Sequence, residues 1–476
     1  MKAERPTLPV AVIGAGPVGL AAAAHLLARG FVPLILETAD HPAGAFQSTR
    51  HVRLFSPWRY NLDREAVRLL ETSGWKSPGL DRLPTAGEMI DDYLAPLAAL
   101  APIRQGLRTG RRVVAITRDG FDKVKTTGRE HAAFLVRTSG AHGHEEHRVY
   151  AVIDASGTWG TPNPLGANGL PAHGEPGLRD RIAYGMPDIL GAARARYAGK
   201  RVLVVGAGHS ATGSLISLAQ LAEEAPGTEV AWAIRGDNLA RIFGGGENDG
   251  LPARGELGLR LKRLRDAQKL TVHTNFRITA LRDGERGIVV EGLRDGATAR
   301  IEGFDEIICA TGSRPDLSLA TELRLKLDPW LESTEALAPL IDPNLHSCGT
   351  VRPHGHRELA HPEAGFYMIG AKSYGRAPNF LLATGYEQAR SVVAALAGDL
   401  QAADDVQLDL PQTGVCSTDF APEKAAAACC GGPASEPEKA CCVNDAKAKA
   451  AGQSGCGCGS ARKAPAPAVA AGCCTG

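Results

Sequence analysis

Two glycine-rich turns in this chain have the spacing that binds the phosphates of a dinucleotide. The first, Gly14-x-Gly16-x-x-Gly19, follows a short apolar strand and opens an Ala/Leu-rich helix. A second apolar run, residues 32–36, ends in Glu37, where a carboxylate can accept hydrogen bonds from ribose hydroxyls. Gly14 permits the turn, Gly16 lets the backbone approach a pyrophosphate, and Gly19 lets helix and strand pack closely. The stretch therefore predicts a dinucleotide site with its pyrophosphate at the helix N-terminus.

The second turn repeats this plan with two changes. Ala211 replaces the third glycine, and the strand 229–234 is followed by Arg235 in place of an acid. A cation at this point suits a 2′-phosphate, which favours NADPH; the alternative is a surface charge at a strand end. The residues expected to hold NADPH are Gly206, Gly208, His209, Ser210, Ala211 and Arg235.

Glu37 would repel a 2′-phosphate, so the first site is expected to hold FAD as the resident cofactor, with NADPH exchanging. We read residues 41–63 as a loop over the bound nucleotide. The residues expected to contact FAD are Gly14, Gly16, Gly19, Glu37, Gln47, Ser56, Gly157, Gly312, Gly370 and Asn379.

The elements that must position these residues follow one plan twice. Each fingerprint is followed by β-like runs and then by a strand that ends in Ser-Gly or Thr-Gly, at Gly157 and Gly312. A third piece, 365–399, is a strand, a loop and a long helix, which is too short to be a domain. We therefore predict an α/β fold of two Rossmann-like domains in three ββα layers, the NADPH domain inserted in the FAD domain. The expected boundaries are 1–165 and 303–400 for the FAD domain, 166–302 for the NADPH domain, and 401–476 for a disordered tail.

Composition excludes several classes of partner. The 476 residues carry a formal net charge of +1, so no basic field predicts nucleic-acid binding. No apolar run reaches the length of a membrane span, and the first strand begins close to Met1. We expect a cytoplasmic protein that binds small molecules and no membrane, with its oligomeric state open.

Residues of roughly 8–400 resemble the flavoproteins with two dinucleotide-binding domains, the group of the flavin-containing and Baeyer–Villiger monooxygenases. The strings LFSPWRYN, GKRVLVVGAGHSA, GGGEND, HSCGTVRPHG and KSYGRAPNFLLATGYEQ are most similar to predicted flavoprotein monooxygenases of bacterial arsenic-resistance operons. Ala155-Ser-Gly157 and Ala310-Thr-Gly312 match that group's crossovers between domains. The F-x-G-x-x-x-H signature of the named monooxygenases is not present; the corresponding connector reads IAYGMPDILGAARARY.

Candidates for flavin-centred chemistry lie in the last part of the fold. The resemblance implies a helix that begins near Pro378-Asn379 and points its positive end at the reduced flavin, although Asn379 alternatively just caps that helix. Cys348 and Arg352 lie in a Gly/Pro-rich loop, together with His346, His354 and His356. This loop could serve a substrate site, hold a metal, or be structural; its spacing matches no standard zinc pattern.

A flavin disulfide reductase is the competing enzyme class, and it needs two redox cysteines beside the flavin. Residues 38–63 contain no cysteine, and Cys309 stands alone in a strand, where it is expected to be a buried small hydrophobe. Electrons from NADPH are therefore expected to pass through the flavin to O2 or to a bound acceptor, which favours a monooxygenase.

The tail holds nine of the eleven cysteines, eight of them in pairs. Adjacent thiols rarely bridge each other, but together they bind soft, thiophilic ions such as As(III), Cu(I), Zn(II) or Hg(II). Two alternatives to a monooxygenase with a metal-capturing tail stay open: a metal(loid) or disulfide reductase that uses tail thiols, and a non-catalytic metal-sequestering flavoprotein. The paired cysteines are Cys429, Cys430, Cys441, Cys442, Cys456, Cys458, Cys473 and Cys474.

Overall fold

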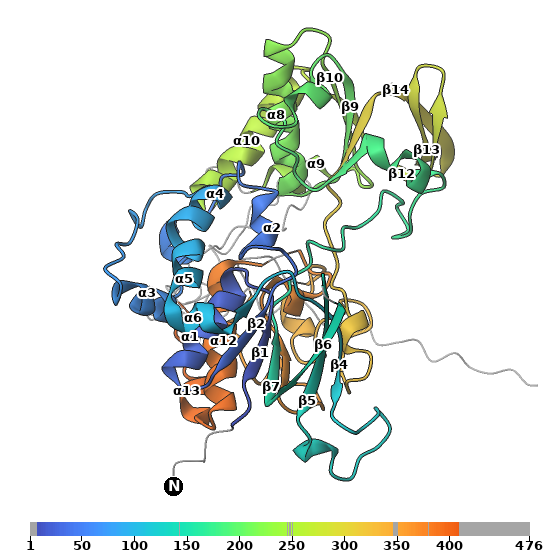
Figure 1. Cartoon of the computed structure of the whole chain (residues 1–476). Helices are drawn as coiled ribbons and strands as arrows, with labels where there is room; N and C mark the ends of the chain where they lie inside the picture. The colour runs from blue at the N-terminus through green and yellow to red at the C-terminus, as the bar shows by residue number, and fades with distance from the viewer. Residues whose placement is uncertain are drawn as a thin grey trace, which may run out of the picture. The chain divides into compact units, whose positions relative to one another are not determined.

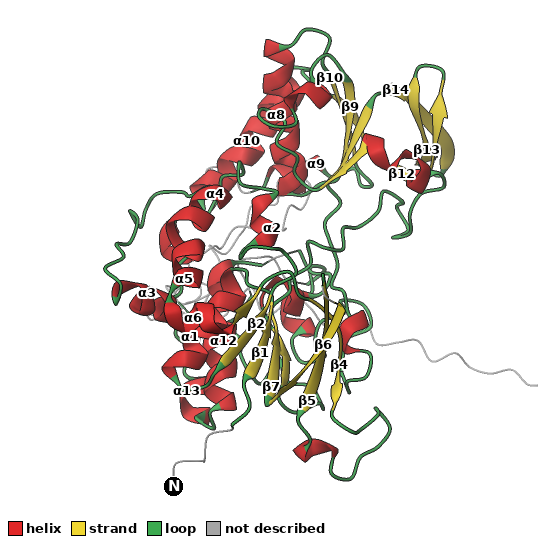
Figure 2. Cartoon of the chain, viewed as in Figure 1, coloured by secondary structure: helices red, strands yellow, loops and turns green. Residues whose placement is uncertain are grey.

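The structure is a computed structural model that describes residues 7–141, 143–244, 246, 249, 251–345, 351–378 and 380–408. Two parallel sheets, each covered by helices on one face and by a three-stranded antiparallel sheet on the other, form its framework (Figures 1 and 2). A search of the described residues for a helix long and apolar enough to cross a membrane finds none. The tail cysteines lie outside the described residues.

The first sheet has five parallel strands in the order β16-β7-β1-β2-β3. Both faces of its central strand β1 are buried: Val10 and Val12 face one core, and Ala11 and Ile13 face the other. This explains why the strand is apolar at every position. In sheet order the strands span Phe366–Met368, Ala151–Asp154, Val10–Ile13, Pro33–Leu36 and Leu107–Arg108.

Two long helices, α1 (Pro17–Ala28) and α12 (Leu382–Leu396), pack against each other over one face of this sheet (Figure 1). Residues Ala21 to Ala24 of α1 are buried, and their small side chains let the helix approach both the sheet and α12. The smaller helical segments of this domain are α2 (Gly44–Gln47), η1 (Trp58–Tyr60), α3 (Arg64–Glu71), α4 (Ala86–Met89), η2 (Ile90–Leu94), α5 (Ala95–Ala99), α6 (Ala101–Gly106), η3 (Arg129–His131), η6 (Ser318–Ala320), α11 (Ala338–Ile341), η7 (Gly370–Tyr374) and α13 (Leu400–Asp404).

The antiparallel sheet β4-β5-β6 covers the opposite face of the first sheet (Figure 2). Phe134 and Val136 of this layer share a core with Val152 and Met368 of the parallel strands. The period-two alternation of apolar residues in the antiparallel strands supplies that packed face. The three strands span Arg112–Arg118, Phe134–Gly140 and Gly143–Val149.

The second domain repeats these layers. Its parallel sheet has the order β11-β10-β9-β15-β8, with α8 and α10 on one face and the antiparallel sheet β12-β13-β14 on the other. The parallel strands span Thr271–His273, Glu229–Ala233, Arg201–Val205, Glu306–Cys309 and Ile182–Tyr184, and the antiparallel ones Phe276–Gly284, Gly287–Arg294 and Ala297–Phe304. The helical segments are η4 (Glu175–Arg181), α7 (Arg194–Tyr197), α8 (His209–Glu224), α9 (Leu239–Phe243) and α10 (Pro252–Asp266).

The predicted class is confirmed: two Rossmann-like domains in ββα layers, with β16 returning to the first sheet after the second domain. Some short elements differ from expectation. β8 lies inside the connector IAYGMPDILGAARARY, for which we predicted no strand, since three residues at a sheet edge carry too little periodic pattern. The expected tail starts at residue 401, yet α13 extends to Asp404 and buries Ala403.

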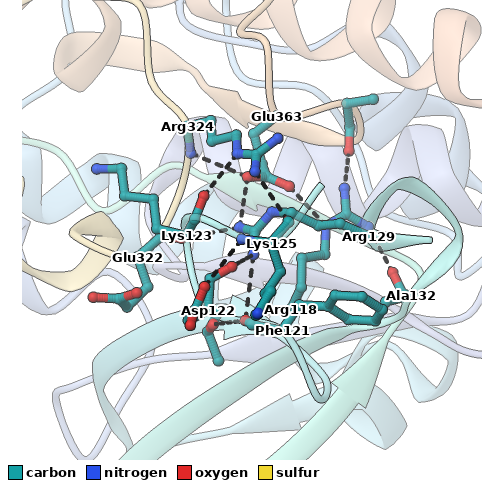
Figure 3. Close-up of polar contacts among 12 residues, drawn as sticks. Arg118, Phe121, Asp122, Lys123, Lys125, Arg129, Ala132, Glu322, Arg324 and Glu363 are labelled. Carbon is teal, nitrogen blue, oxygen red and sulfur yellow. Dashed lines mark hydrogen bonds and ion pairs between the residues drawn. The ribbon is translucent and has the colours of Figure 1, made fainter. Parts of the chain in front are cut away.

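A buried charge cluster fastens the antiparallel layer to the returning segment (Figure 3). Glu363 accepts hydrogen bonds from Arg118 Nε at 2.8 Å and from Arg129 Nη2 at 2.9 Å, and each of the three side chains is at most 4% exposed. The backbone N–H of Arg324 donates to the same carboxylate at 3.0 Å. Because two buried cations share one carboxylate, its removal leaves charge without compensation.

Replacement of Glu363 with Gln should therefore lower the free energy of unfolding by about 3 kcal/mol. The control Glu335→Gln, which affects an exposed pair with Lys326, should change it by no more than about 0.5 kcal/mol. Burial opposes ionisation of Glu363, but hydrogen bonds from Arg129 and Arg118 outweigh it and lower the pKa overall.

This stabilisation is present above the ordinary carboxyl pKa and is lost as the pH falls through the lowered folded-state pKa. Chemical denaturation as a function of pH measures both effects. Equal stability of Glu363→Gln and the control variant would contradict this account of the cluster.

Candidate functional site: two dinucleotide cradles

The first fingerprint forms an open cradle at the carboxyl edge of the first sheet. Gly14 has φ +96°, and a Cβ there would lie 2.9 Å from the carbonyl oxygen of Ala155. A Cβ on Gly19 would overlap the Gly14 carbonyl oxygen, so the helix and the turn leave no room for one. A Cβ on Gly16 would meet nothing within 4 Å, and Gly16 is the N-cap of α1 without a side-chain cap. The cradle thus offers open backbone N–H groups at a helix N-terminus, which fit a pyrophosphate.

The second fingerprint has the same geometry. Gly206 has φ +138°, and a Cβ there would overlap the carbonyl oxygen of Ala310. Gly208, the N-cap of α8, again faces open space and has no side-chain cap. Ala211 is buried at the third position, so its methyl group is accommodated by the core. Each predicted fingerprint therefore has a tight turn against a crossover carbonyl and an open ligand side.

Both crossovers carry the expected glycines. Gly157 has φ +70° and faces open space, whereas Gly312 has φ +89° and accepts, through its carbonyl, the backbone N–H of Asn163 at 2.9 Å. Asn163 Nδ2 also donates to Thr311 O at 3.1 Å, and Arg314 Nε donates to Asn163 Oδ1 at 2.9 Å. The two crossovers are thus bonded to each other, and Asn163 is a central residue that the sequence pattern did not single out.

Glu37 lies at the end of β2, next to the first turn. Its carboxylate accepts backbone hydrogen bonds from Ala15 at 2.7 Å and from Ala39 at 2.9 Å. The carbonyl of Ala15 in turn accepts from the N–H of Ala43, a buried residue with φ +58°. The Glu37 carboxylate therefore stabilises the first glycine-rich turn. Each of its two oxygens keeps a further lone pair that can accept a hydrogen bond from a ribose hydroxyl.

The expected loop 41–63 is partly helical and firmly held. Gln47 ends α2, where it accepts a hydrogen bond from Arg50. Ser56 Oγ donates to Asn61 Oδ1 at 3.0 Å, and Asn61 Nδ2 donates to Ser56 O at 2.7 Å. The carbonyl of Asn61 accepts from the hydroxyl of Tyr386 on α12 at 2.8 Å. Buried Asn61 thus connects Ser56 to the returning helix α12 through hydrogen bonds. The sequence did not predict this role, because a single polar residue in a loop forms no recognisable pattern.

Val18 of α1 lies beside the start of η7 and beside the first turn of α12. A Cβ on Gly370 would lie 3.4 Å from Val18, and a Cβ on Gly385 would lie 2.6 Å from Val18 and 2.8 Å from Phe380. A glycine at position 385 thus lets α12 approach α1 this closely. α12 begins at Leu382 rather than near Asn379, and Leu381 caps it without a side-chain hydrogen bond. Asn379 lies outside the described residues.

The loop with the remaining catalytic candidates is held against the first domain by hydrogen bonds. His354 is buried; its Nδ1 donates to Arg352 O at 2.9 Å and its Nε2 accepts from Gln388 Nε2 at 2.9 Å. Burial lowers the pKa of His354, which keeps the ring neutral, as this bonding requires. Gln388 Oε1 also accepts from the N–H of Gly370 at 2.7 Å. The side chain of Arg352 is exposed, and the backbone carbonyl of this residue is the group that the network uses.

A metal site in this loop finds no support among the described residues. His356 Nε2 pairs with Asp404 at 2.9 Å, away from the partners of His354. No group of three or more His, Cys, Asp or Glu side chains within the described ranges could hold an ion. Cys348 and His346 lie outside the described residues, as do all the cysteines of the tail.

His209 and Ser210 begin α8, directly after Gly208. The ring of Phe55 lies 5.2 Å from the ring of His209, centroid to centroid. Surrounding protein atoms lower the pKa of His209, and the charge of Arg254 lowers it further, so a neutral imidazole is favoured near pH 7. Arg235 is exposed after β10, and its Nη1 donates to Ala167 O at 3.3 Å, a long bond that a stronger acceptor can replace.

The fold and the paired cradles define a flavoprotein oxidoreductase with two dinucleotide sites. The family model described as pyridine nucleotide-disulphide oxidoreductase matches residues 11–349, and the chain belongs to this family. It is an oxidoreductase that uses FAD and NADPH.

Solved structures share this fold. The bacillithiol disulfide reductase from Bacillus cereus is 18% identical, with a TM-score of 0.59 over 82% of this chain and 99% of that one. The FAD-bound cadaverine monooxygenase of desferrioxamine biosynthesis from Erwinia amylovora is 14% identical, with a TM-score of 0.59 over 85% and 97%. The ornithine N-hydroxylase from Kutzneria sp. 744 is 16% identical, with a TM-score of 0.54 over 83% and 100%.

We expect Gly385→Val to separate α12 from α1, because the added side chain collides with Val18 and Phe380. The displaced start of α12, which lies beside the helix of the first fingerprint, should lower FAD affinity by about tenfold, which corresponds to about 1.4 kcal/mol. Fluorescence titration of the apoprotein with FAD measures it. Gly213→Ala in α8, where a Cβ meets nothing within 4 Å, is the matched control and should bind FAD as the wild type does. Equal affinities of the two variants would contradict the proposed role of Gly385.

Proposed function

We propose that this oxidoreductase is a monooxygenase that oxidises a small molecule with O2, in the context of arsenic or metal resistance. One observation carries the proposal: Cys309 is the cysteine within the described residues, and it lies buried in β15. Its Sγ contacts Asn163 O at 3.4 Å and Thr311 Oγ1 at 3.2 Å. Burial raises the pKa of the thiol to about 11, so it stays protonated and unreactive near neutral pH.

The chain's own residues suit oxygen chemistry. When bound, FAD supplies the electron transfer and NADPH supplies the electrons. Ser56, Tyr60, Leu251, Leu381 and Leu382 line a small, largely apolar pocket at the start of α12. Its leucines exclude water, while the uncapped N-terminus of α12 favours negative charge beside it. Exclusion of water from this pocket would suppress side reactions during oxygen chemistry.

Arg235 is proposed to select NADPH through its 2′-phosphate. We expect Arg235→Gln to lower kcat/KM for NADPH by about 10- to 100-fold, because a charge-assisted bond contributes about 1.5–3 kcal/mol. The value for NADH should change little. Initial rates of oxidation of both nucleotides test this selection. An equal loss of kcat/KM for NADPH and NADH would contradict the role proposed for Arg235.

The tail is proposed to capture a thiophilic metal or metalloid through its paired cysteines. A second candidate function, reduction of a disulfide or metal(loid) by those thiols, is favoured by the family's disulphide oxidoreductase members and by the fold shared with the Bacillus cereus reductase. The third is a non-catalytic, metal-sequestering flavoprotein. α13 packs against the first domain, so the tail is best tested by substitution in the full chain rather than by truncation at residue 402.

Oxygen dependence separates these functions. We expect sustained NADPH oxidation only in the presence of O2, with no acceleration by a disulfide or by arsenate under anaerobic conditions. Cys309→Ala and a variant with its eight paired tail cysteines changed to Ser should both retain oxygen uptake, because neither thiol set carries the electrons. Anaerobic turnover with a disulfide or arsenate that disappears in the tail variant would establish the reductase instead. A flavin that NADPH does not reduce would support the non-catalytic protein.

A further inference from the structure

A buried ion pair lies at the carboxyl edge of the first sheet, outside both fingerprints. Lys372 of η7 is 1% exposed and Asp154, the last residue of β7, is fully buried; Lys372 Nζ and Asp154 Oδ2 lie 2.6 Å apart. Lys372 Nζ also donates to Ser156 Oγ at 3.0 Å. Asp154 Oδ1 accepts from Ser156 Oγ at 2.7 Å and from Ser156 N at 3.1 Å.

Such a cluster is costly unless every member is satisfied. A buried ammonium loses its hydration, and its attraction to a carboxylate offsets that loss only with good geometry and further hydrogen bonds. Here Ser156 donates to Asp154 Oδ1 and accepts from Lys372 Nζ, whereas Asp154 Oδ2 makes the ion pair with Lys372 and has no hydrogen-bond partner among the described residues. Hydrophobic residues could fill the same space at no cost in stability, so the pair points to a positional requirement.

Three backbone segments meet at this unit. The carbonyl of Ala155, between Asp154 and Ser156, is the group against which Gly14 packs. The carbonyl of Asp154 accepts the N–H of Ile369 at 2.9 Å, one residue before Gly370. The ion pair therefore joins the crossover, the first fingerprint and the returning segment, which come from distant parts of the sequence.

We propose that Lys372 is a positioning residue for FAD. Its bond to Asp154 and Ser156 holds the crossover backbone under Gly14 and holds η7 beside α1, so that the cradle has its binding shape before FAD arrives. The ion pair acts through the backbone that it fixes, and preorganisation of this kind increases affinity because less ordering is needed on binding. The inference rests on FAD binding alone and does not depend on whether the electrons reach O2 or a disulfide.

FAD titration of the full-length apoprotein tests the proposal, at a temperature well below the unfolding transition of every variant. Under that condition a purely stabilising role does not change the Kd, whereas a positioning role does. Lys372→Met should raise the Kd for FAD by about tenfold or more. The double variant Asp154→Asn with Lys372→Met leaves no buried charge unpaired but lacks the same bond, so it should bind FAD about as weakly as Lys372→Met.

Two further variants complete the design. Lys326→Met breaks an exposed ion pair with Glu335 in the same domain and should leave the Kd unchanged. Ser156→Ala keeps the ion pair but frees the crossover backbone, and should raise the Kd by about threefold even if Lys372→Met fails to fold. An unchanged Kd in Lys372→Met or in Ser156→Ala would overturn the proposal, as would a double variant that binds FAD as tightly as the wild type. Loss of FAD binding in Lys326→Met would also overturn the proposal.

Discussion

The structure depends on one close contact, made twice: the first glycine of a nucleotide turn packs against the carbonyl of a crossover. Gly14 meets Ala155 and Gly206 meets Ala310, in each case with no room for a side chain. Because each crossover leaves its sheet at this point, the contact fixes the turn, the helix that follows it, and the path to the other domain. The second glycine of each turn then faces open space, where a diphosphate can reach the helix N-terminus.

Around the first cradle, polar groups satisfy one another and leave the ligand side free. Glu37 bonds the turn, Gln388 bonds Gly370 and His354, and Asn61 bonds Ser56. These bonds lie within the first domain itself, so the protein sets the shape of the first cradle before a cofactor binds. Reactive thiols play no part in the described framework, where Cys309 is buried and bonded.

Sequence alone was sufficient for the features that repeat a strong pattern. The glycine spacing, the apolar strands and the long helix of residues 382–396 predicted the two Rossmann-like domains and the return of the chain to the first one. The roles of individual polar residues could not be predicted from the sequence, because Asn61 and Gln388 acquire their roles only from partners that are distant in the sequence. Gly385 was missed for the same reason: its neighbour Val18 lies on another helix.

The central claim is that the two cradles bind different dinucleotides, FAD at Gly16 and NADPH at Gly208. A Cβ at either position would meet no protein atom within 4 Å, so we expect both valine variants to fold. The decisive measurement is the visible flavin absorption before and after anaerobic addition of NADPH. The account predicts that Gly16→Val is colourless yet binds NADPH, and that Gly208→Val retains FAD that NADPH no longer bleaches. Retention of reducible FAD in both variants, or its loss from both, would contradict the account.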